Sequence, residues 1–234
     1  MSFTKIGLST CRNRQHMEIQ LTHPQPDGYL ALPPTGQGKP VLVLHAWWGL
    51  NATIKAICDR LAAAGFVAFA ADLYHGEVAA TIPDAERLGH GVDSNFLGTR
   101  ADVAAAAKFL SERAGHPDPG LAVIGFSLGA SYALDLAVTE PERVHSVVVF
   151  YGSWGEHFER SKASYLGHFA EHDPYEPAAG VDALEAALKA AGRPATIHRY
   201  PGAGHWFFEP DRTAEYNAVA ASLAWERTVS FLSR

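Results

Sequence analysis

The stretch that decides the fold is Leu121-Ala122-Val123-Ile124-Gly125-Phe126-Ser127-Leu128-Gly129, in which a short apolar run leads into a serine between two glycines. Such a run, bounded by glycines, is typical of a strand buried on both faces of a sheet. A helical pattern follows from about 128 to 138. A serine at a sharp strand-to-helix turn is the setting of a nucleophile elbow, although a helix N-cap serine with flanking glycines has the same local sequence.

Strands and helices are predicted to alternate along most of the chain. Further buried strands are expected at 41–44, 66–70, 147–150, 165–170 and 195–200, and further helices at 53–64, 99–114, 181–191 and 212–232. This alternation implies a parallel sheet with helices on both faces, joined by right-handed crossovers. The segments 74–98 and 152–164 are long and rich in glycine and histidine, and we expect them to be loops that wall a pocket beyond the strand ends.

The N-terminal part is predicted to add an antiparallel hairpin at one edge of this sheet. Met17–Leu21 and Gly28–Leu32 are short extended runs, and prolines and an Asp-Gly pair lie between them. Residues 1–16 are polar and unpatterned, which is typical of a frayed tail. We expect the whole chain, 1–234, to form a single domain.

Composition excludes several classes of protein. The net charge is −6 and no basic run is present, which argues against a nucleic-acid partner. Two cysteines, Cys11 and Cys58, are too few for a disulfide framework. No apolar stretch is long enough for a membrane span or a secretory signal, so we expect no membrane partner and a cytoplasmic location. Either a monomer or a homodimer is compatible with the sequence.

A serine hydroxyl becomes an effective nucleophile only beside a base, and His205 is the best placed of the twelve histidines. It follows the turn 201–204 after the last predicted strand, so it should reach the same sheet edge as Ser127. His45 and Asp72 also follow strands, but both precede the elbow, whereas the expected order along the chain is serine, acid, histidine. The alternative for His205 is an ordinary surface-loop histidine.

The acid of the triad should lie between the elbow and His205, directly after a strand. Asp173 meets this condition because it follows the predicted strand at 165–170. Its carboxylate would accept the Nδ1–H of His205, fix the tautomer and stabilise the imidazolium. The rival acids are Glu171, Glu176 and, more weakly, Asp182. We therefore predict a triad of Ser127, Asp173 and His205.

An oxyanion formed at Ser127 would need preorganised N–H donors. The backbone N–H of Leu128, at the start of a helix, is one candidate. The second is expected in the loop after the strand at 41–44, where we assign the N–H of Trp47. Trp47 and Trp48 could also wall an apolar pocket, while core packing is the alternative for one of them.

These pieces together resemble the dienelactone hydrolase family of α/β-hydrolases. The stretches that carry the resemblance are Val41–Leu50, Phe66–Tyr74, Gly125–Gly129, the loop around Asp173 and Gly202–Phe207, and they follow the family's order across nearly the whole chain. The resemblance implies an eight-stranded, mostly parallel sheet with a minimal cap. It also implies the same triad, with Trp47 and Leu128 as oxyanion donors.

Three positions depart from the family's founding enzymes. Those enzymes carry a cysteine at the elbow, where this chain has Ser127, and a glutamate after the first buried strand, where it has Ala46. They also carry an arginine that binds the substrate carboxylate shortly after the histidine, whereas this chain has Glu209 there. Glu209 would repel an anion, so these departures favour a neutral, apolar or aromatic ester. Arg87 or Arg100 could still supply a positive charge.

The sequence thus predicts a serine hydrolase that cleaves a small carboxylic ester or lactone without a cofactor or metal. The residues expected to contact the substrate are Trp48, Tyr74, Trp154 and Phe207. Two alternatives stay open. The same triad could serve an acyltransferase, if an alcohol outcompetes water, or the protein could be a non-catalytic ligand-binding member of the fold.

Overall fold

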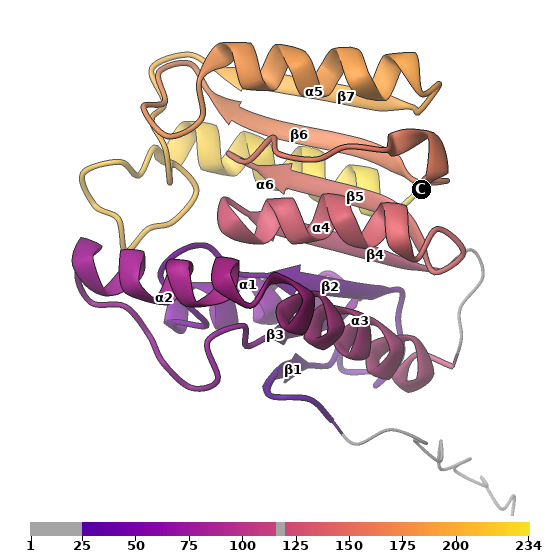
Figure 1. Cartoon of the computed structure of the whole chain (residues 1–234). Coiled ribbons are helices and arrows are strands. Elements are labelled where there is room, and N and C mark those ends of the chain that lie inside the picture. The colour runs from indigo at the N-terminus through magenta and orange to yellow at the C-terminus, as the bar shows by residue number, and fades with distance from the viewer. Residues whose placement is uncertain (1–24, 116–119) are drawn as a thin grey trace, which may run out of the picture.

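A seven-stranded sheet is the centre of the computed structural model, which describes residues 25–115 and 120–234 (Figure 1). The strands are β1 (Gly28–Ala31), β2 (Pro40–Leu44), β3 (Val67–Ala71), β4 (Leu121–Phe126), β5 (Val144–Phe150), β6 (Ser164–Ala170) and β7 (Ala195–Tyr200). Their order across the sheet is β1-β3-β2-β4-β5-β6-β7. Only β1 runs antiparallel to its neighbour, so the predicted, mostly parallel sheet is confirmed. The run at 17–21, predicted as an eighth strand, and the tail at 1–16 lie outside the described residues.

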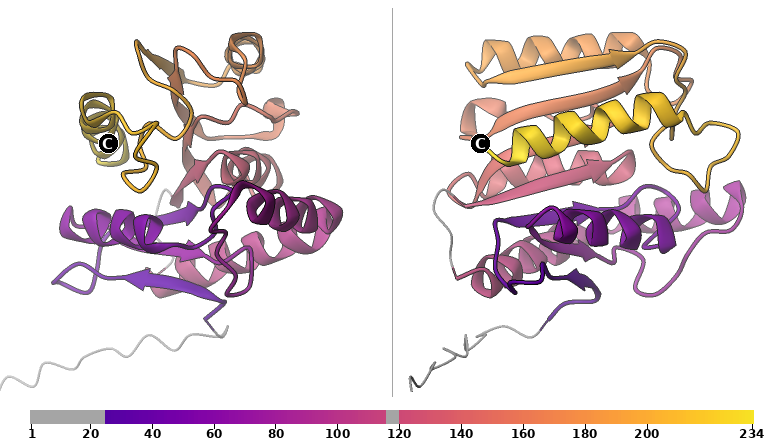
Figure 2. Two further views of the ribbon diagram at one scale, coloured as in Figure 1. Left: turned by 90° about the vertical axis from the view of Figure 1, so that its left-hand side faces the viewer. Right: turned by 180° about the vertical axis from the view of Figure 1, so that it is seen from behind.

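Helices cover both faces of the sheet (Figure 2). They are α1 (Ala52–Ala63), α2 (Ile82–Ser94), α3 (Phe96–Arg113), α4 (Leu128–Thr139), α5 (Ala178–Ala190) and α6 (Ala218–Leu232), with a short 3-10 turn, η1, at Phe158–Arg160. α1 and α6 lie on one face, and α3, α4 and α5 lie on the other. The central strands β2, β3 and β4 are buried along their whole length, which explains why their sequences are continuously apolar.

The segment 74–98, predicted as a loop, contains the helix α2, so that prediction was wrong. Thr81 caps the helix, because its Oγ1 accepts a hydrogen bond from the N–H of Asp84. Ala85, Leu88 and Val92 lie at helical spacing and are buried. The glycines and histidine of this stretch hid the pattern, although the Thr-x-x-Asp sequence at its start is a recognisable helix signal.

The last helix begins at Ala218, six residues after the predicted start at 212. Asn217 sets the start, because its side-chain oxygen accepts a hydrogen bond from the N–H of Ala220 at 3.1 Å. The preceding segment, 201–217, is a run of turns in which the N–H of Asn217 donates to the carbonyl of Phe207. This longer loop carries His205, so it matters for the site.

Candidate active site

The elbow serine lies at the predicted strand-to-helix turn and has a strained backbone. Ser127 has φ +48° and ψ −113°, between the end of β4 and the first residue of α4. A non-glycine residue in such a region costs about 1–3 kcal/mol and persists only where its surroundings enforce it. Glycine is required on both sides: a Cβ at Gly125 would lie 2.4 Å from the carbonyl oxygen of Gly129, and one at Gly129 would lie 2.3 Å from that of Leu44.

The three residues predicted as a triad lie in hydrogen-bonding contact. The Nδ1 of His205 lies 2.7 Å from Oδ2 of Asp173, and its Nε2 lies 3.1 Å from Oγ of Ser127. Because the carboxylate can only accept, Nδ1 carries the proton and Nε2 is free to accept the serine O–H. The side chains of His205 and Asp173 are only 4% and 3% exposed, so this relay is shielded from water.

A turn after β6 fixes the orientation of Asp173. Its Oδ1 accepts hydrogen bonds from the N–H groups of Tyr175 and Glu176, both at 2.9 Å. One carboxylate oxygen is therefore held by backbone while the other faces His205. The rival acids are engaged elsewhere: Glu171 accepts from Gly202 N–H, Glu176 from Ser153 Oγ, and Asp182 from Arg199.

His45 and Asp72, the two groups set aside because they precede the elbow, have structural partners. The N–H of Leu73 donates to Nε2 of His45 at 3.1 Å, so the imidazole Nδ1–H must donate to the carbonyl of Ala46 at 2.8 Å. Burial lowers the pKa of His45, which keeps the ring neutral. The carboxylate of Asp72 accepts the N–H groups of Tyr74 and Gly76 and closes a turn.

A cavity of about 230 Å³ opens over the serine. It is lined by Trp47, Ser127, Leu128, Ser131, Gly152, Tyr175, Glu176, His205 and Trp206. Both residues predicted as oxyanion donors, Trp47 and Leu128, are therefore in the same cavity as the serine. The segments that line it follow β2, β4, β5, β6 and β7, whose C-terminal ends share one edge of the parallel sheet.

The residues predicted to contact the substrate do not line this cavity, and that part of the prediction was wrong. Trp48, Tyr74 and Phe207 are buried in the core. Trp154 is 62% exposed and packs edge-on against Phe96. Aromatic composition alone does not reveal which face of a loop a ring occupies.

Two aromatic residues of the cavity were missed by the sequence reasoning. The ring of Tyr175 packs at a tilt against His205 and that of Trp206 meets it edge-on, with ring centroids at 5.0 and 4.9 Å. Tyr175 also meets Trp47 edge-on at 6.2 Å. Their positions in the sequence could have identified them, because Tyr175 lies two residues after Asp173 and Trp206 directly follows His205. The loop at 152–164, predicted as a pocket wall, contributes Gly152.

No arginine or lysine is present among the described residues that line the cavity. Arg87 donates to Glu77 and Arg100 donates to Asp135, so both candidate cations are paired. Glu209, predicted to repel anions, is fully buried and does not line the cavity, so that reasoning was also wrong. Glu176 is the carboxylate that lies in the wall.

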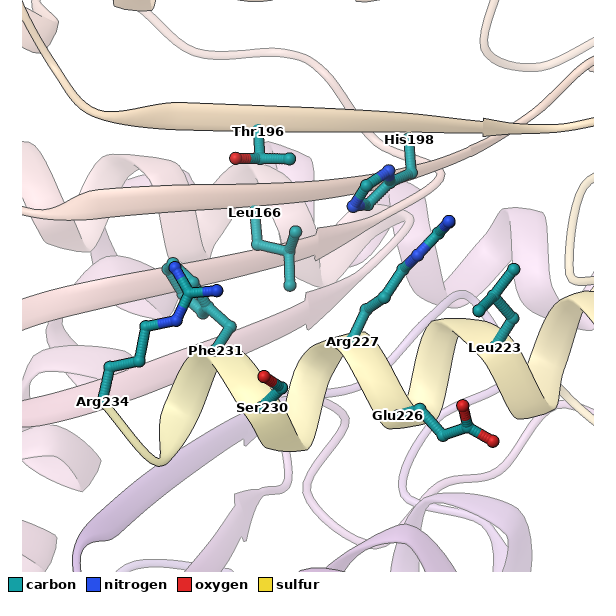
Figure 3. Close-up of a pocket in the computed structure, with 9 residues that line it drawn as sticks. All are labelled: Leu166, Thr196, His198, Leu223, Glu226, Arg227, Ser230, Phe231 and Arg234. Atoms are coloured by element: carbon teal, nitrogen blue, oxygen red, sulfur yellow. The ribbon is translucent and has the colours of Figure 1, made fainter.

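A separate cavity of about 270 Å³ lies between α6 and the strands β6 and β7 (Figure 3). Arg227 of α6 extends there toward His198 of β7. Its lining shares no residue with the cavity over Ser127. The hydrogen-bonded triad therefore belongs to the other cavity.

Within residues 25–115 and 120–234, no three histidine, cysteine or acidic side chains are grouped so that they could hold a metal. No helix in those ranges is long and apolar enough to cross a membrane. Cys58 is buried in α1, where burial raises the pKa of its thiol to about 12 and suppresses its reactivity. Cys11 lies outside the described residues.

Known proteins resemble this chain over nearly its whole length. The dienelactone hydrolase family pattern matches residues 27–234. "Protein usf" of Aquifex pyrophilus is 31% identical over 224 residues, covering 93% of this chain and 96% of the relative. A Bradyrhizobium protein named "Probable 2-oxo-3-(5-oxofuran-2-ylidene)propanoate lactonase" is 32% identical over 219 residues, covering 87% of each.

Solved structures share the fold. The "Putative Dienelactone Hydrolase" of Klebsiella pneumoniae superposes with a TM-score of 0.76 at 26% identity, covering 88% of this chain and 92% of that one. A second structure, "m3DLH", has a TM-score of 0.79 at 23% identity, covering 88% and 91%. The predicted α/β-hydrolase fold and the resemblance drawn from the motifs are both confirmed. This chain is a carboxylic ester hydrolase that belongs to the dienelactone hydrolase family.

Proposed function

We propose that this chain is a serine hydrolase that cleaves a small, uncharged carboxylic ester or lactone through an acyl-enzyme intermediate. The observation that carries the proposal is the continuous relay from Ser127 Oγ through His205 to Asp173, at 3.1 and 2.7 Å. A nucleophile within reach of a base that a third group orients is the arrangement that acyl transfer requires.

In the first half of the proposed reaction, Ser127 Oγ attacks the ester carbonyl carbon while Nε2 of His205 takes the hydroxyl proton. The carbonyl oxygen becomes an oxyanion, which the N–H groups of Trp47 and Leu128 would stabilise; losing one such donor typically costs about 10²–10³ in rate. The tetrahedral species then collapses. His205 gives its proton to the leaving alkoxide, and the acyl group stays on Ser127.

In the second half, water takes the place of the alcohol. His205 accepts a proton from that water, whose oxygen attacks the acyl carbon and forms a second oxyanion. Collapse of this species breaks the bond to Ser127 Oγ, and His205 returns its proton to the serine. Asp173 keeps Nδ1–H pointing away from the serine in both halves, so that Nε2 is available as the base.

The charge of the cavity favours uncharged substrates. Its described lining carries the carboxyl of Glu176 and no arginine or lysine. A carboxylate brought into this cavity would lose hydration without gaining an opposite charge. The rings of Trp47, Tyr175 and Trp206 instead offer apolar surface to an acyl or alkoxy group.

Hydrolysis of a p-nitrophenyl ester series, from acetate to octanoate, tests the proposal with wild type and Ser127→Ala. Wild type should turn over at least one ester, and the variant should lose at least about 10³-fold in kcat. Mass spectrometry of rapidly quenched wild type should detect one added acyl group, which Ser127→Ala should not form. Unchanged turnover in folded Ser127→Ala protein would refute the serine mechanism.

A further inference from the structure

Glu209 is a fully buried acidic residue four positions after His205. One of its carboxyl oxygens, Oε1, accepts the O–H of Tyr151 at 2.6 Å. The other, Oε2, has no hydrogen-bond partner among the described residues. A buried carboxyl with one oxygen unpaired is costly, so packing alone does not explain its presence. Its place beside the triad raises the question of what it does there.

Tyr151 connects Glu209 to the catalytic histidine. It directly follows β5, has φ +39°, and is fully buried. Its N–H donates to the carbonyl of His168 at 2.9 Å, which fixes the backbone at this strained position. Its ring lies against the imidazole of His205, with centroids 4.9 Å apart at an angle of 54°. The tyrosine is thus held at its backbone and at its hydroxyl, with the imidazole against its ring.

We propose that Glu209 and Tyr151 form a positioning pair for His205, in which the Glu209 carboxyl holds the Tyr151 ring against the imidazole and, when ionised, stabilises the imidazolium. This inference rests on the proposed role of His205 as the catalytic base. Neither residue lines the cavity over Ser127, so the pair acts through His205 and not on the substrate.

The groups around the pair define its charge state. Asp211 and Arg212 face Glu209 from its own loop, Tyr151 faces it from the end of β5, and Asp173 acts on Tyr151 from the triad side. Burial raises the pKa of Glu209 to about 8, while the hydrogen bond from Tyr151 and the charge of Arg212 act in the opposite direction. The carboxyl is therefore neutral at neutral pH and becomes an anion at mildly alkaline pH.

Ionisation places a negative charge on the carboxyl that binds the Tyr151 hydroxyl, and the ring of that tyrosine lies against the imidazole that must become positive in the transition state. We expect kcat of wild type to rise about three- to tenfold across the ionisation of Glu209. The imidazole C–H resonances of His205 should show the same event as an inflection near pH 8 in an NMR titration. This second measurement needs no substrate.

Glu209→Gln is the first test, because glutamine still accepts the Tyr151 O–H but cannot ionise. The variant should lose both the alkaline rise in kcat and the NMR inflection. Glu215→Gln, the same change in the same loop on a partly exposed side chain, should keep both. Tyr151→Phe keeps the ring and removes the hydroxyl that hydrogen-bonds to Glu209. For this variant kcat should fall about tenfold with little change in KM.

Tyr151→Phe also makes a directional prediction. Removing the hydrogen bond that lowers the pKa of Glu209 should move the His205 NMR inflection to higher pH. An inflection that persists in Glu209→Gln, or that is absent from wild type, would overturn the proposal. So would equal pH profiles of wild type and Glu209→Gln with only a difference in melting temperature, the pattern of a purely structural pair. Loss of the serine mechanism would appear separately, as turnover retained by Ser127→Ala.

Discussion

Gly89 of α2 lies directly against the indole of Trp47, so closely that a Cβ at position 89 would be 2.8 Å from Nε1. Trp47 follows β2 and lines the cavity over Ser127. Its backbone N–H is a proposed oxyanion donor. The helix that the sequence reasoning missed is therefore in contact with the loop on which the proposed mechanism depends.

Gly89→Ala should lower kcat by shifting the Trp47 loop. A new methyl group at this distance forces the indole to move, and the backbone N–H on the same residue would move with it. We expect a loss of about tenfold in kcat, a fraction of what removal of an oxyanion donor costs. Steady-state hydrolysis of p-nitrophenyl acetate measures it.

Gly91→Ala is the matched control. It lies on the same helix, and a Cβ there would meet no atom within 4 Å. Alanine is the better helix former by about 1 kcal/mol, so this variant should keep wild-type kcat and melt at the same or a higher temperature. Equal activity of the two variants would contradict the proposed effect of this contact between α2 and the oxyanion loop on catalysis.

Much of the fold was predictable because parallel strands buried on both faces are continuously apolar. β2, β3 and β4 are examples, and each was found within a residue or two of its bounds. α2 was not found, because Gly89 and Gly91 weaken helix propensity and because tertiary packing on Trp47 compensates for it. The start of α6 was misplaced because a side-chain cap at Asn217, and not hydrophobic periodicity, determines it.

The triad was predictable from order and position, since each member follows a strand whose C-terminal end reaches the same sheet edge. The pocket wall was not predictable in this way. Trp48 and Phe207 are buried without lining the cavity, whereas their neighbours Trp47 and Trp206 line it, even though the rings of Trp48 and Trp206 meet edge-on with centroids 5.2 Å apart. Whether a ring in such a loop reaches the cavity depends on the local backbone geometry, such as φ +61° at Trp206, which the residue type alone does not reveal.

Asp173→Asn should lower kcat on the order of 10³–10⁴-fold while the protein stays folded. An amide in this position can donate to Nδ1 and so favours the tautomer whose proton sits on Nε2, where it blocks acceptance from Ser127. Asp182→Asn makes the same chemical change at a rival acid that pairs with Arg199 on the surface, and it should retain most of the activity. If Asp182→Asn lost more activity than Asp173→Asn, the assignment of Asp173 as the acid of the triad would be wrong.

The stability of Glu209→Gln relative to wild type should depend on pH. The pKa of Glu209 is about 8 in the folded protein and 4.5 without its environment. The stabilisation that comes from holding the neutral carboxyl is complete below pH 4.5 and is lost as pH rises through 8. Wild type should lose up to about 1.4 kcal/mol per pH unit across this window, and the glutamine variant should not.

Denaturant unfolding of both proteins at matched pH values measures this difference. Subtracting the two curves cancels every other titrating group that they share. The stability advantage of Glu209→Gln should grow from about pH 5 to pH 8 and then level off. A difference that is constant with pH would mean that Glu209 titrates in the folded state as it does in the unfolded chain.

The charge of the cavity should decide between substrates of equal size. p-Nitrophenyl butyrate and p-nitrophenyl hemisuccinate have acyl chains of similar length, but the second ends in a carboxylate. Because the described lining carries Glu176 and no arginine or lysine, kcat/KM should be at least about tenfold higher for the neutral ester.

Glu176→Gln should narrow that ratio about fivefold, the effect of removing a repulsion on the order of 1 kcal/mol. The ratio is the informative quantity, because the substitution also disturbs the hydrogen bond from Ser153 and with it the rate on either ester alone. A hemisuccinate preference in wild type would reveal a cation near the bound acyl group and would refute the assignment of an uncharged substrate.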